Sequence, residues 1–415
     1  MTAPTPSADR AVAVTGLGMI TPAGVGREAT WQGVLRGEST AAHDPELKEL
    51  SSGAFSCRIP PFAPGEGRIG GGKAWRMSRF TQLAVLAARE AVADAGLDPK
   101  SWDGARVAVV IGSGLAGAAH LEEQTVRMHQ AGPDFVSPVL IPMLISNMAA
   151  GEVALDLTAH GPSLATETAC ASGASALVVA RDLLLSGACD IAVAGGTEAA
   201  ISPVVTTGFQ RMGALSGRND APVAASRPFA ADRDGFVISE GAAILVLERA
   251  ADAKARGRSG YALLAGTGAS SDAHHPTAPA PGGTVAETAL RLAVADAGLD
   301  VADVDHVNAH GTSTPLNDST EAELIGRVLP HGPSVTSAKG VLGHSLGAAG
   351  AIEAALTALT IHHGTVPPTA NLTPQNLEFP LNCVTGEPSH QEVRAAASHS
   401  FGFGGHNVVL VLRAV

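Results

Sequence analysis

The octapeptide Ala-Val-Ala-Asp-Ala-Gly-Leu-Asp occurs twice in this chain, at residues 91–98 and again at residues 293–300. Each copy ends a segment whose apolar residues have helical spacing. Each is soon followed by an apolar, β-prone segment, at 107–111 and at 304–307. One such match could arise by chance, because alanine-rich helices resemble one another. Two further matches in the same order favour an internal duplication.

The further matches are a strand and the start of a helix. Residues 244–250 resemble residues 408–414, and residues 170–174 resemble residues 344–348. The two apolar helices should lie at the centre of the molecule between sheets, with Cys170 and His344 at equivalent helix starts that face one cavity. We therefore expect an α/β fold of two halves related by a pseudo-twofold axis, residues 11–255 and residues 260–415.

Residues 168–188 predict a buried helix with a cysteine at its start. Only Arg181 and Asp182 are charged in this stretch, so the helix is apolar on nearly every side. Small residues surround Cys170, and the N-terminus of a helix favours a thiolate over a thiol. We interpret Cys170 as a candidate nucleophile. A buried structural cysteine is the alternative that this stretch leaves open.

Composition argues against several classes of function. The net charge is −12 and there is no basic run, which argues against a nucleic-acid-binding protein. The four cysteines form no CxxC pair, a pattern suited to a reducing cytosol. Residues 1–10 carry no secretion signal, and no uncharged apolar run is long enough to span a membrane. We expect a cytoplasmic protein with no nucleic-acid or membrane partner and no metal centre.

Glycines are expected to end two of the predicted strands. Residues 11–15 are apolar and β-prone and lead into a predicted glycine turn at 16–18. Residues 190–194 form another apolar strand, which residues 195–196 should close. Residues 78–95 predict a helix between them. Because no full GxGxxG motif is present, the first glycine turn does not establish a nucleotide site.

Two histidines and a lysine lie in glycine-containing turns of the second half. Residues 308–318 begin at the end of a predicted strand, where α/β enzymes place their chemistry, and they contain His310. Lys339 precedes His344 in an otherwise apolar region. A buried lysine is costly without a partner, and Glu353 is the candidate counter-charge. A structural histidine and a structural ion pair are the alternatives.

Four motifs resemble those of the β-ketoacyl-acyl-carrier-protein synthases, the elongating condensing enzymes of the thiolase superfamily. The match covers essentially the whole chain, and motif by motif it is most similar to the synthase II type. The resemblance implies a thiolase-like fold with a five-layered α-β-α-β-α core. The motifs are Thr168-Ala-Cys-Ala-Ser-Gly, Asn308-Ala-His-Gly-Thr-Ser-Thr-Pro, Ala338-Lys-Gly-Val-Leu-Gly-His and Ser400-Phe-Gly-Phe-Gly-Gly.

This resemblance implies a decarboxylative Claisen condensation in fatty acid chain elongation. Cys170 would take an acyl group from the phosphopantetheine thiol of an acyl carrier protein, because a thiolate is both nucleophile and leaving group for a thioester. His310 and His344, as neutral donors, would hydrogen-bond the malonyl thioester while its carboxylate is lost. The backbone N–H groups of Cys170 and Phe403 would hold the oxyanion of the carbon–carbon bond-forming step.

The resemblance also implies supporting residues around the catalytic groups. Lys339 with Glu353 would hold His344 and tune the local field rather than act as a base. Phe403, in its glycine loop with Phe401, would gate access to the cysteine.

Further supporting roles follow for the substrate-binding side. Thr312 and Thr314 would hydrogen-bond the pantetheine arm. Leu115, at a position where the family often has isoleucine, would lie in the acyl pocket. Asp318 is named as a further supporting residue of the site.

The resemblance raises one cofactor question. Some members of the family bind a monovalent cation near the positions of Asn308, Glu353 and Ser398. His399 stands where members often have asparagine, which weakens that expectation. No other cofactor is implied.

Acyl carrier proteins are acidic, so docking requires a local basic patch on this acidic chain. Members of the family are homodimers, and apolar residues 135–136 and 141–143 would suit a buried interface. Ordinary surface charge is the alternative for each basic candidate. The docking candidates are Lys73, Arg76, Arg79 and Arg211.

Three alternatives bear on the function. A thiolase or an initiating synthase that uses acyl-coenzyme A would need a second catalytic cysteine or a Cys–His–Asn set, and this chain has His344 at the third position. A chain-length-factor-like partner subunit would lack the nucleophile. A catalytic ketosynthase of a type II polyketide or polyene pathway, working as a heterodimer with a chain-length-factor subunit, keeps the same chemistry and stays open.

Overall fold

The computed structural model describes residues 11–50, 54–61 and 74–415. Within these residues, one 11-stranded mixed sheet runs through the molecule. Its strands are β1 (Val12–Thr21), β2 (Gly24–Val25), β5 (Val107–Gly112), β6 (Ser163–Thr166), β7 (Ile191–Glu198), β8 (Gly241–Arg249), β9 (Ala262–Ser271), β10 (His306–Asn308), β11 (Ser334–Thr336), β14 (Ala395–Gly402) and β15 (His406–Arg413). Two short ribbons, β3 (Ala42–His43) with β4 (Phe55–Ser56) and β12 (Thr365–Val366) with β13 (Ser389–His390), lie apart from it.

The strand order repeats about the centre of the sheet. From the centre outward, one side reads β1-β8-β7-β5-β6 and the other reads β9-β15-β14-β10-β11. The two sides meet where β1 and β9 pair antiparallel over three residue pairs, Val12 with Leu264 to Val14 with Ala262. This order is the pseudo-twofold arrangement that the repeated octapeptide predicts. The boundaries expected for the halves, 11–255 and 260–415, stay a prediction.

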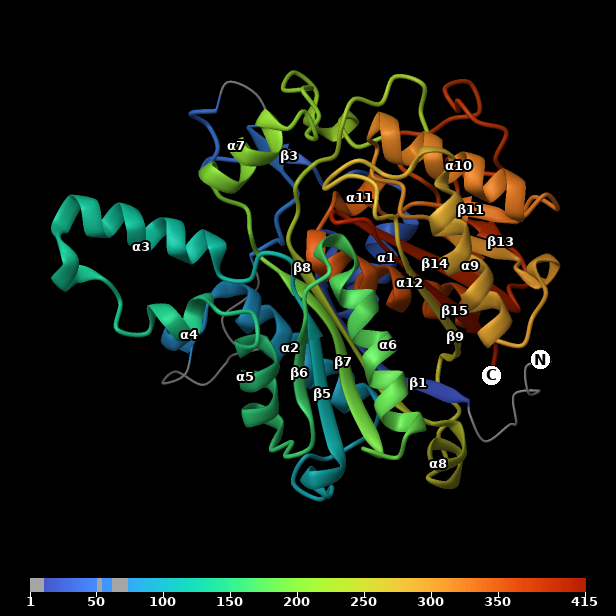
Figure 1. Ribbon diagram of the computed structural model, residues 1–415, viewed down its shortest axis with the longest axis horizontal. Coiled ribbons are helices and arrows are strands. Elements are labelled where there is room, and N and C mark those ends of the chain that lie inside the picture. Colours follow the sequence, from blue (N-terminus) through green and yellow to red (C-terminus); the bar gives the residue numbers. More distant parts are fainter. Residues whose placement is uncertain (1–10, 51–53, 62–73) are drawn as a thin grey trace.

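Helices cover the sheet in layers that can be followed from left to right in Figure 1. Three apolar clusters fill the spaces between these layers: the first around α6 and α12, the second between α2, α5 and the first-half strands, and the third between α9, α10 and the second-half strands. This is the expected five-layered core. The helices that form it are α2 (Arg79–Asp94), α5 (Met148–Leu157), α6 (Ser172–Leu185), α9 (Thr284–Asp296), α10 (Pro315–Val328) and α12 (Ala349–His363).

Glycines inside the central strands let the outer helices approach closely. A Cβ on Gly18 of β1 would lie 1.9 Å from the carbonyl oxygen of Ala87, and a Cβ on Gly268 of β9 would lie 2.0 Å from that of Ala289. The expected turn at residues 16–18 is therefore wrong, because these glycines lie within β1 against α2. The matching contact in the second half, between β9 and α9, shows that the duplication extends to packing.

Residues 195–196 likewise continue a strand instead of closing it. β7 runs to Glu198. A Cβ on Gly195 would lie 2.0 Å from the carbonyl oxygen of Ala243 in β8, and a Cβ on Gly196 would meet the start of α12. Close approach of backbone, not a change in chain direction, requires glycine at both positions.

The central helices α6 and α12 contact each other reciprocally. A Cβ on Gly173 would lie 2.8 Å from the backbone nitrogen of Ala351, and a Cβ on Gly350 would lie 2.9 Å from the backbone nitrogen of Ala174. These contacts make Gly173 the counterpart of Gly350 in the two halves.

Counting three residues back from each of these glycines leads to Cys170 and Gly347. The counterpart of Cys170 is therefore Gly347, and the expected equivalence with His344 is wrong by three residues. The dipeptide Gly-Ala occurs at 347–348 and again at 350–351, and only packing shows which one matches residues 173–174.

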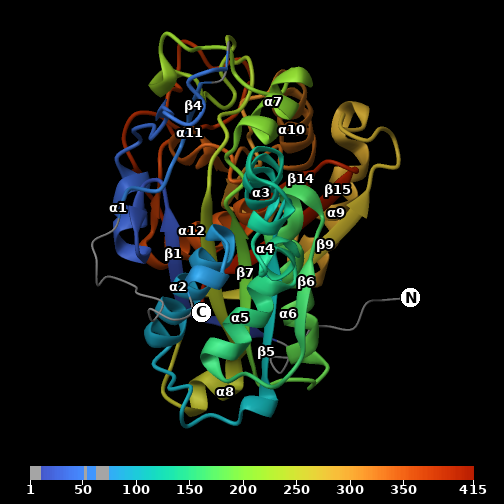
Figure 2. The same cartoon turned by 90° about the vertical axis from the view of Figure 1, so that its left-hand side faces the viewer.

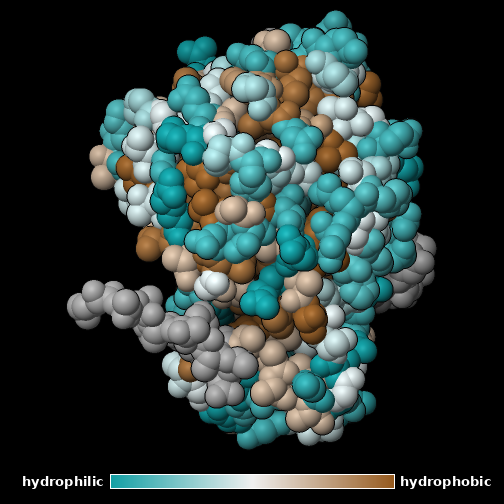
Figure 3. Space-filling view, turned by 90° about the vertical axis from the view of Figure 1, so that its right-hand side faces the viewer, coloured by the Kyte–Doolittle hydropathy of each residue, from teal (hydrophilic) through white to brown (hydrophobic). Residues whose placement is uncertain are grey.

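One hairpin of helices projects from the layered body (Figures 1 and 2). It consists of α3 (Ala118–Ala131) and α4 (Leu140–Leu144). Phe135 and Ile141 are both 61% exposed on it, so it carries large apolar side chains in contact with solvent. Figure 3 shows that the opposite side of the molecule is a mosaic of hydrophilic and hydrophobic residues. The remaining helices are α1 (Arg27–Leu35), α7 (Pro203–Arg211), α8 (Ala250–Ala255) and α11 (Lys339–Leu342).

Candidate active site

Cys170 lies in the short turn of 3-10 helix, Ala169–Ala171, that leads directly into α6. Ala169 has a φ of 49°, a left-handed conformation that a residue with a side chain rarely adopts. The backbone N–H of Phe403 faces the Cys170 sulfur and acts to lower the pKa of the thiol. Gly402 lies against the same turn, and a Cβ there would be 3.2 Å from the backbone nitrogen of Cys170. The glycine loop after β14 therefore packs directly on the cysteine.

The electrostatic environment of the thiol differs from the expectation. Burial raises the pKa of Cys170 to about 11, although the charge of Lys339 and the N–H of Phe403 act to lower it. The carboxylates of Glu198 and Glu353 raise it further. A position at a helix start does not by itself give a resting thiolate, because desolvation of the charged form is the larger effect.

His310 follows β10 and is held by its backbone. The backbone N–H of His310 donates to Glu321 Oε1 at 2.8 Å, and the backbone N–H of Gly311 donates to Glu321 Oε2 at 2.7 Å. The ring packs edge-on against the rings of His344 and Phe401. Burial, with the charge of Lys339 next, holds the pKa of His310 well below 6.5, so the imidazole is neutral.

His344 is positioned by a bridge to the segment before β8. Its N–H donates to the carbonyl of Val237 at 2.8 Å, and its carbonyl accepts from Ser239 at 3.1 Å. The ring is T-shaped against Phe236, with centroids 5.2 Å apart, and its centroid lies 5.4 Å from that of His310. Burial and then the charge of Lys339 hold the pKa of His344 well below its usual value.

Lys339 and Glu353 form the buried ion pair that the sequence predicts, and both side chains are 2% exposed. The histidine beside them differs from the prediction. Lys339 Nζ lies 3.4 Å from Nδ1 of His310, whereas Nδ1 of His344 has no hydrogen-bond partner among the described residues. The backbone bridge of His344 to Val237 and Ser239 places its ring against Phe236 instead.

A cavity of about 320 Å³ joins these groups. Cys170, His310 and His344 all line it, so the expectation of one common cavity is confirmed. Thr312 and Thr314 line it too, and their hydroxyl oxygens are 2.8 Å apart. The other lining residues of note are Phe209, Phe236, Leu316, Leu346, Phe401 and Phe403.

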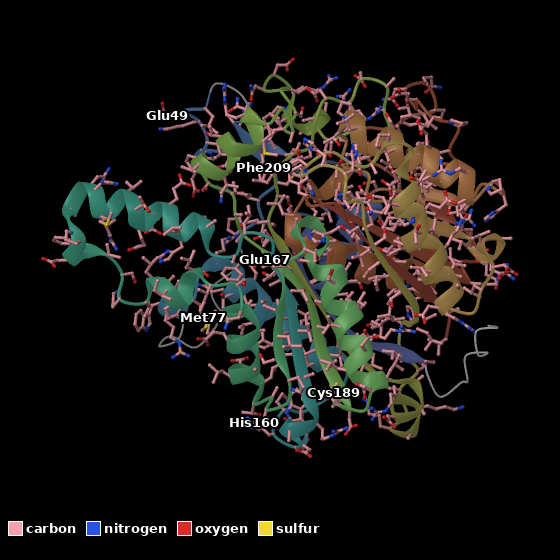
Figure 4. All side chains as sticks on the ribbon, in the orientation of Figure 1. Glu49, Met77, His160, Glu167, Cys189 and Phe209 are labelled. Atoms are coloured by element: carbon pink, nitrogen blue, oxygen red, sulfur yellow. The ribbon has the colours of Figure 1, made fainter. Side chains whose placement is uncertain are left out.

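Figure 4 labels Phe209 and Cys189, which lie toward opposite ends of the first-half strands. Phe209, which lines the cavity, lies near the upper end of the first-half strands, and Cys189 lies near their lower end. Cys57, Cys189 and Cys383 do not line the cavity, and burial raises the pKa of each of these thiols. Cys170 is therefore the cysteine placed for reaction.

The predicted acyl-pocket residue Leu115 packs on one apolar cluster with Cys170. It does not line the cavity itself. The cluster continues through Ile201, Phe236 and Leu346, so the thiol lies between the open cavity and a packed apolar region.

Asp318 acts through the backbone. Its carboxylate accepts from the N–H groups of Phe229, at 2.9 Å, and Ser313, at 3.1 Å, and burial raises its pKa to about 6. Ser313 has a φ of 68°, so this carboxylate fixes a left-handed residue between the two threonines.

Sequence reasoning missed two buried carboxylates of the site. Glu321 holds the turn of His310, and Glu198 holds the turn that follows β5. For Glu321, the available signal was an acidic residue on the helix face that also carries Leu324, Ile325 and Val328. For Glu198, it was an acidic residue at the end of the apolar strand β7. His399 Nδ1 lies 3.0 Å from Glu321 Oε1, so this departure from the family pattern faces α10.

The docking candidates fall in different places. Lys73 lies outside the described residues. Arg76 pairs with Glu152 at 3.2 Å, and Arg79 makes two hydrogen bonds to Glu240, at 2.6 and 2.7 Å. Arg211 is exposed on α7, the helix that brings Phe209 to the cavity.

The three positions named for a cation hold unpaired oxygens. Within the described residues, Asn308 Oδ1, Glu353 Oε2 and Ser398 Oγ are buried without a hydrogen-bond partner. Asn308 and Ser398 are register partners on β10 and β14, and the amide of Asn308 donates to the carbonyl of Glu353 at 3.3 Å. The three oxygens therefore come from adjacent positions.

A duplicated five-layered α/β core with a buried cysteine facing two neutral histidines defines a thiolase-fold condensing enzyme. Family models agree. One described as "Beta-ketoacyl synthase, N-terminal domain" matches residues 9–253, and one described as "Beta-ketoacyl synthase, C-terminal domain" matches residues 261–373. The chain belongs to the β-ketoacyl synthase family.

Curated relatives match over nearly their full length. A protein of Synechocystis sp. named 3-oxoacyl-[acyl-carrier-protein] synthase 2 is 41% identical over 418 residues, covering 97% of each chain. A Staphylococcus aureus protein of the same name is 41% identical over 414 residues, covering 98% of this chain and 99% of its own.

Solved structures of the same family superpose closely. A β-ketoacyl synthase from Burkholderia phymatum STM815 has a TM-score of 0.90 at 33% identity, with 98% of this chain and 99% of that chain covered. The ishigamide ketosynthase/chain length factor has a TM-score of 0.89 at 34% identity, with 98% and 100% covered. A type II polyketide synthase acyl-carrier protein in complex with its ketosynthase bound to the hexaketide also matches, with a TM-score of 0.89 at 32% identity and the same coverage. No helix within the described residues is long and apolar enough to cross a membrane.

Proposed function

We propose that this protein is a β-ketoacyl-acyl-carrier-protein synthase that elongates an acyl chain held on Cys170 with a malonyl unit. The observation that carries this proposal is the convergence of Cys170, His310 and His344 on one cavity, with the Phe403 N–H directed at the sulfur. The names of the curated relatives support the same activity.

The first half-reaction moves the acyl group to the enzyme. The sulfur of Cys170 attacks the carbonyl carbon of the acyl thioester, the bond to the phosphopantetheine sulfur breaks, and the thiol proton of Cys170 ends on the departing carrier thiol. Because the Cys170 pKa is about 11, the enzyme rests as the thiol and the proton leaves during attack.

The second half-reaction makes the carbon–carbon bond. Malonyl-carrier protein loses CO2, and the electron pair becomes an enolate whose oxygen accepts hydrogen bonds from His310 and His344. The enolate carbon attacks the acyl carbon on Cys170, and the carbon–sulfur bond breaks to give the β-ketoacyl product and a thiolate that takes up a proton. Lys339 supports this role, because an ammonium facing Nδ1 of His310 leaves the hydrogen on Nε2.

The remaining predicted residues fit the path of the carrier arm. Thr312 and Thr314 present hydroxyl groups to the cavity, and Phe403 and Phe401 form its wall beside Cys170. We assign the threonines to the pantetheine amides and the phenylalanine loop to access control.

Intact mass spectrometry tests the proposal. The protein is mixed with acyl-carrier proteins of graded chain length, and malonyl-carrier protein is then added. We expect a gain of one acyl group that is absent in Cys170→Ala, present in the control Cys189→Ala, and discharged as β-ketoacyl product. Loading only from coenzyme A thioesters would contradict the elongating assignment.

A second candidate function keeps the chemistry and changes the pathway. The solved ketosynthase/chain length factor and the polyketide ketosynthase complex match this chain as closely as the Burkholderia enzyme does. A catalytic subunit of a type II polyketide pathway would use the exposed apolar hairpin of α3 and α4 against a different chain. Loading that appears only after a companion chain-length-factor subunit is added would favour this function over a homodimeric synthase.

We also propose a monovalent cation as a structural ligand. The unpaired oxygens of Asn308, Glu353 and Ser398 fit such an ion, because hard cations prefer oxygen ligands. His399 adds no oxygen, since it faces Glu321. The test compares the melting temperature in potassium chloride and in tetramethylammonium chloride at equal ionic strength. A higher value in potassium supports the site, and equal values contradict it.

Docking and location complete the proposal. Arg211 is the docking candidate best placed for an acidic carrier protein, because it is exposed on the helix that reaches the cavity. Arg211→Glu should raise the KM for acyl-carrier protein, whereas Arg394→Glu, on an exposed arginine that does not line the cavity, should not.

The four free thiols support a cytoplasmic location.

A further inference from the structure

Glu198, the last residue of β7, joins two loops from different halves of the chain. Its fully buried carboxylate accepts hydrogen bonds from the N–H groups of Gly114 at 2.7 Å, Leu115 at 3.2 Å and Gly347 at 3.1 Å. The hydroxyl of Ser113 donates a fourth at 3.2 Å. Among the described residues it forms no ion pair. Burial raises the pKa of Glu198 to about 7, although these donors act to lower it.

The two loops lie against each other beside the apolar cluster that contains Cys170. Leu115 comes from the loop after β5, and Leu346 precedes Gly347 at the start of α12. Both leucines belong to the apolar cluster that contains Cys170. One carboxylate therefore accepts hydrogen bonds from the loops that carry both leucines.

The approach of the loops is tight. A Cβ on Gly347 would lie 2.2 Å from the backbone nitrogen of Gly114 and 2.8 Å from Glu198 Oε2. Leu346 has a φ of 46° and Ala116 a φ of 47°, so a residue with a side chain is held in the left-handed conformation on each side. Such conformations persist only when the surrounding contacts determine them.

The duplication explains why an anion fits here. Gly347 is the counterpart of Cys170, so its N–H stands at the start of α12 as the N–H of Cys170 stands at the start of α6. The start of a helix presents free N–H groups that favour negative charge. At the start of α6, the space beside these N–H groups opens to the cavity. At the start of α12, the carboxylate of Glu198 occupies the corresponding space.

We propose that Glu198 is a positioning residue that sets acyl chain-length selectivity by holding Leu115 and Leu346 at a fixed separation beside Cys170. This inference rests on the proposed synthase function. It assigns Glu198 no contact with the substrate: the carboxylate acts through the two loops, and its effect belongs to acyl loading and not to malonyl decarboxylation.

The test uses Glu198→Gln. The N–H groups of both loops converge on Oε2, so a glutamine can keep its oxygen there. Its NH2 group then replaces the Oε1 acceptor of Ser113 and Leu115, and the hydrogen bonds to both loops lose the strength that a charged acceptor gives them. The matched control is Glu248→Gln, an equally buried carboxylate of β8 that accepts from Thr15 at 2.6 Å and pairs with Arg256, none of which lines the cavity.

Two rates are measured for the wild-type protein and both variants. The first is the rate of Cys170 acylation by acyl-carrier proteins of graded length, and the second is CO2 release from malonyl-carrier protein. The preference is the ratio of the acylation rate with the preferred acyl chain to the rate with a chain two carbons longer. We expect Glu198→Gln to lower this ratio by at least about threefold. Decarboxylation should stay within about twofold of the wild type, since His310 and His344 are untouched.

Three results would overturn the proposal. An unchanged selectivity would show that Glu198 does not set the separation of Leu115 and Leu346. An equal loss of acylation at all chain lengths together with decarboxylation would show general damage. Failure of the wild-type protein to accept any acyl group would remove the synthase function itself, and is distinguishable because it needs no variant. If Glu198→Gln is insoluble, Glu198→Asp carries the test, because a shorter carboxylate cannot reach both loops.

Discussion

Lys339 Nζ lies 3.4 Å from Nδ1 of His310, and the same ammonium pairs with the carboxylate of Glu353. His344, five residues further along the chain, receives only the more distant field of that charge. The lysine therefore fixes the tautomer of one histidine directly, while the backbone bridge to Val237 and Ser239 fixes the orientation of the other.

This relationship predicts that the charge pair and the tautomer can be separated by mutation. Lys339→Met should destabilise the protein by about 3–5 kcal/mol, because Glu353 is left buried without its cation. Lys339→Met combined with Glu353→Gln should recover most of that stability. Malonyl decarboxylation should remain about 100-fold reduced in the double variant, because Nδ1 of His310 has lost its donor.

Thermal denaturation and CO2 release measure the two effects. Lys254→Met, on an exposed residue of α8, is the control for loss of a lysine charge. A double variant that decarboxylates at the wild-type rate would contradict the role of Lys339 at His310.

The raised pKa of Cys170 predicts a pH dependence for its alkylation. Because the thiolate is the reactive form, the rate with iodoacetamide should rise about tenfold per pH unit from pH 7 to pH 10. Lys339 lowers this pKa, and Glu198 and Glu353 raise it, so Glu198→Gln should move the profile to lower pH. Peptide mass spectrometry identifies the alkylated cysteine, with Cys170→Ala as the negative control. A plateau below pH 8 would contradict the structure.

The same pKa shift has a consequence for stability. The folded-state pKa of about 11 lies above the value of about 8.5 for an unfolded cysteine, so folding favours the protonated thiol. Its contribution is fully present below about pH 8.5 and is lost as the pH rises toward 11. Cys170→Ala should therefore reduce the loss of stability between pH 8.5 and 11, as measured by urea denaturation.

Gly402 is predicted to be indispensable for acylation. A Cβ at this position would lie 2.5 Å from the carbonyl oxygen of Thr168 and 3.2 Å from the nitrogen of Cys170. Gly402→Ala should therefore displace the loop that directs the Phe403 N–H at the sulfur, and slow acyl loading by about 100-fold.

The control is Gly151→Ala in α5, where a Cβ would meet nothing within 4 Å. This change should leave loading unaltered and raise the melting temperature, because alanine is the better helix former. Normal loading by Gly402→Ala would show that the loop adjusts, and would weaken the assigned oxyanion site.

The duplicated packing contacts predict matched losses of stability. Gly18→Ala and Gly268→Ala each place a methyl group within about 2 Å of a helix carbonyl, so each should cost about 1–3 kcal/mol. Urea denaturation should give similar values for both, and Gly326→Ala in α10, where nothing lies within 4 Å, should cost nothing. Widely different costs for the two glycines would contradict their equivalence.

Much of the site could be predicted from the sequence because its residues lie in local motifs. Cys170, His310 and Lys339 each follow a strand or begin a helix, and His344 lies shortly after the short helix that Lys339 begins. Register across the pseudo-twofold could not be predicted, because residues 347–351 contain the dipeptide Gly-Ala twice and only the contact of Gly350 with Ala174 selects one.

Other features depend on contacts between distant segments. From the sequence alone, Gly18 is typical of a turn, and only its close approach to Ala87 shows that it lies within a strand. Which histidine lies beside Lys339 depends on the hydrogen bond between His344 and Val237. Glu198 gives only the signal of an acid at the end of an apolar strand. Its structural role depends on hydrogen bonds from backbone N–H groups of residues about 80 and 150 positions away in the sequence.

The position of β1 in the sheet bears on how the protein is made. This strand is synthesised well before β8 and β9, with which it pairs: Met19 pairs with Ala243, and Val12 pairs with Leu264. At about 5–20 residues per second, the ribosome needs tens of seconds to supply them. During that time β2 pairs with only the last two residues of β1, so most of this apolar strand lacks its partners. We therefore expect the nascent chain to be prone to aggregation until β8 and β9 are made.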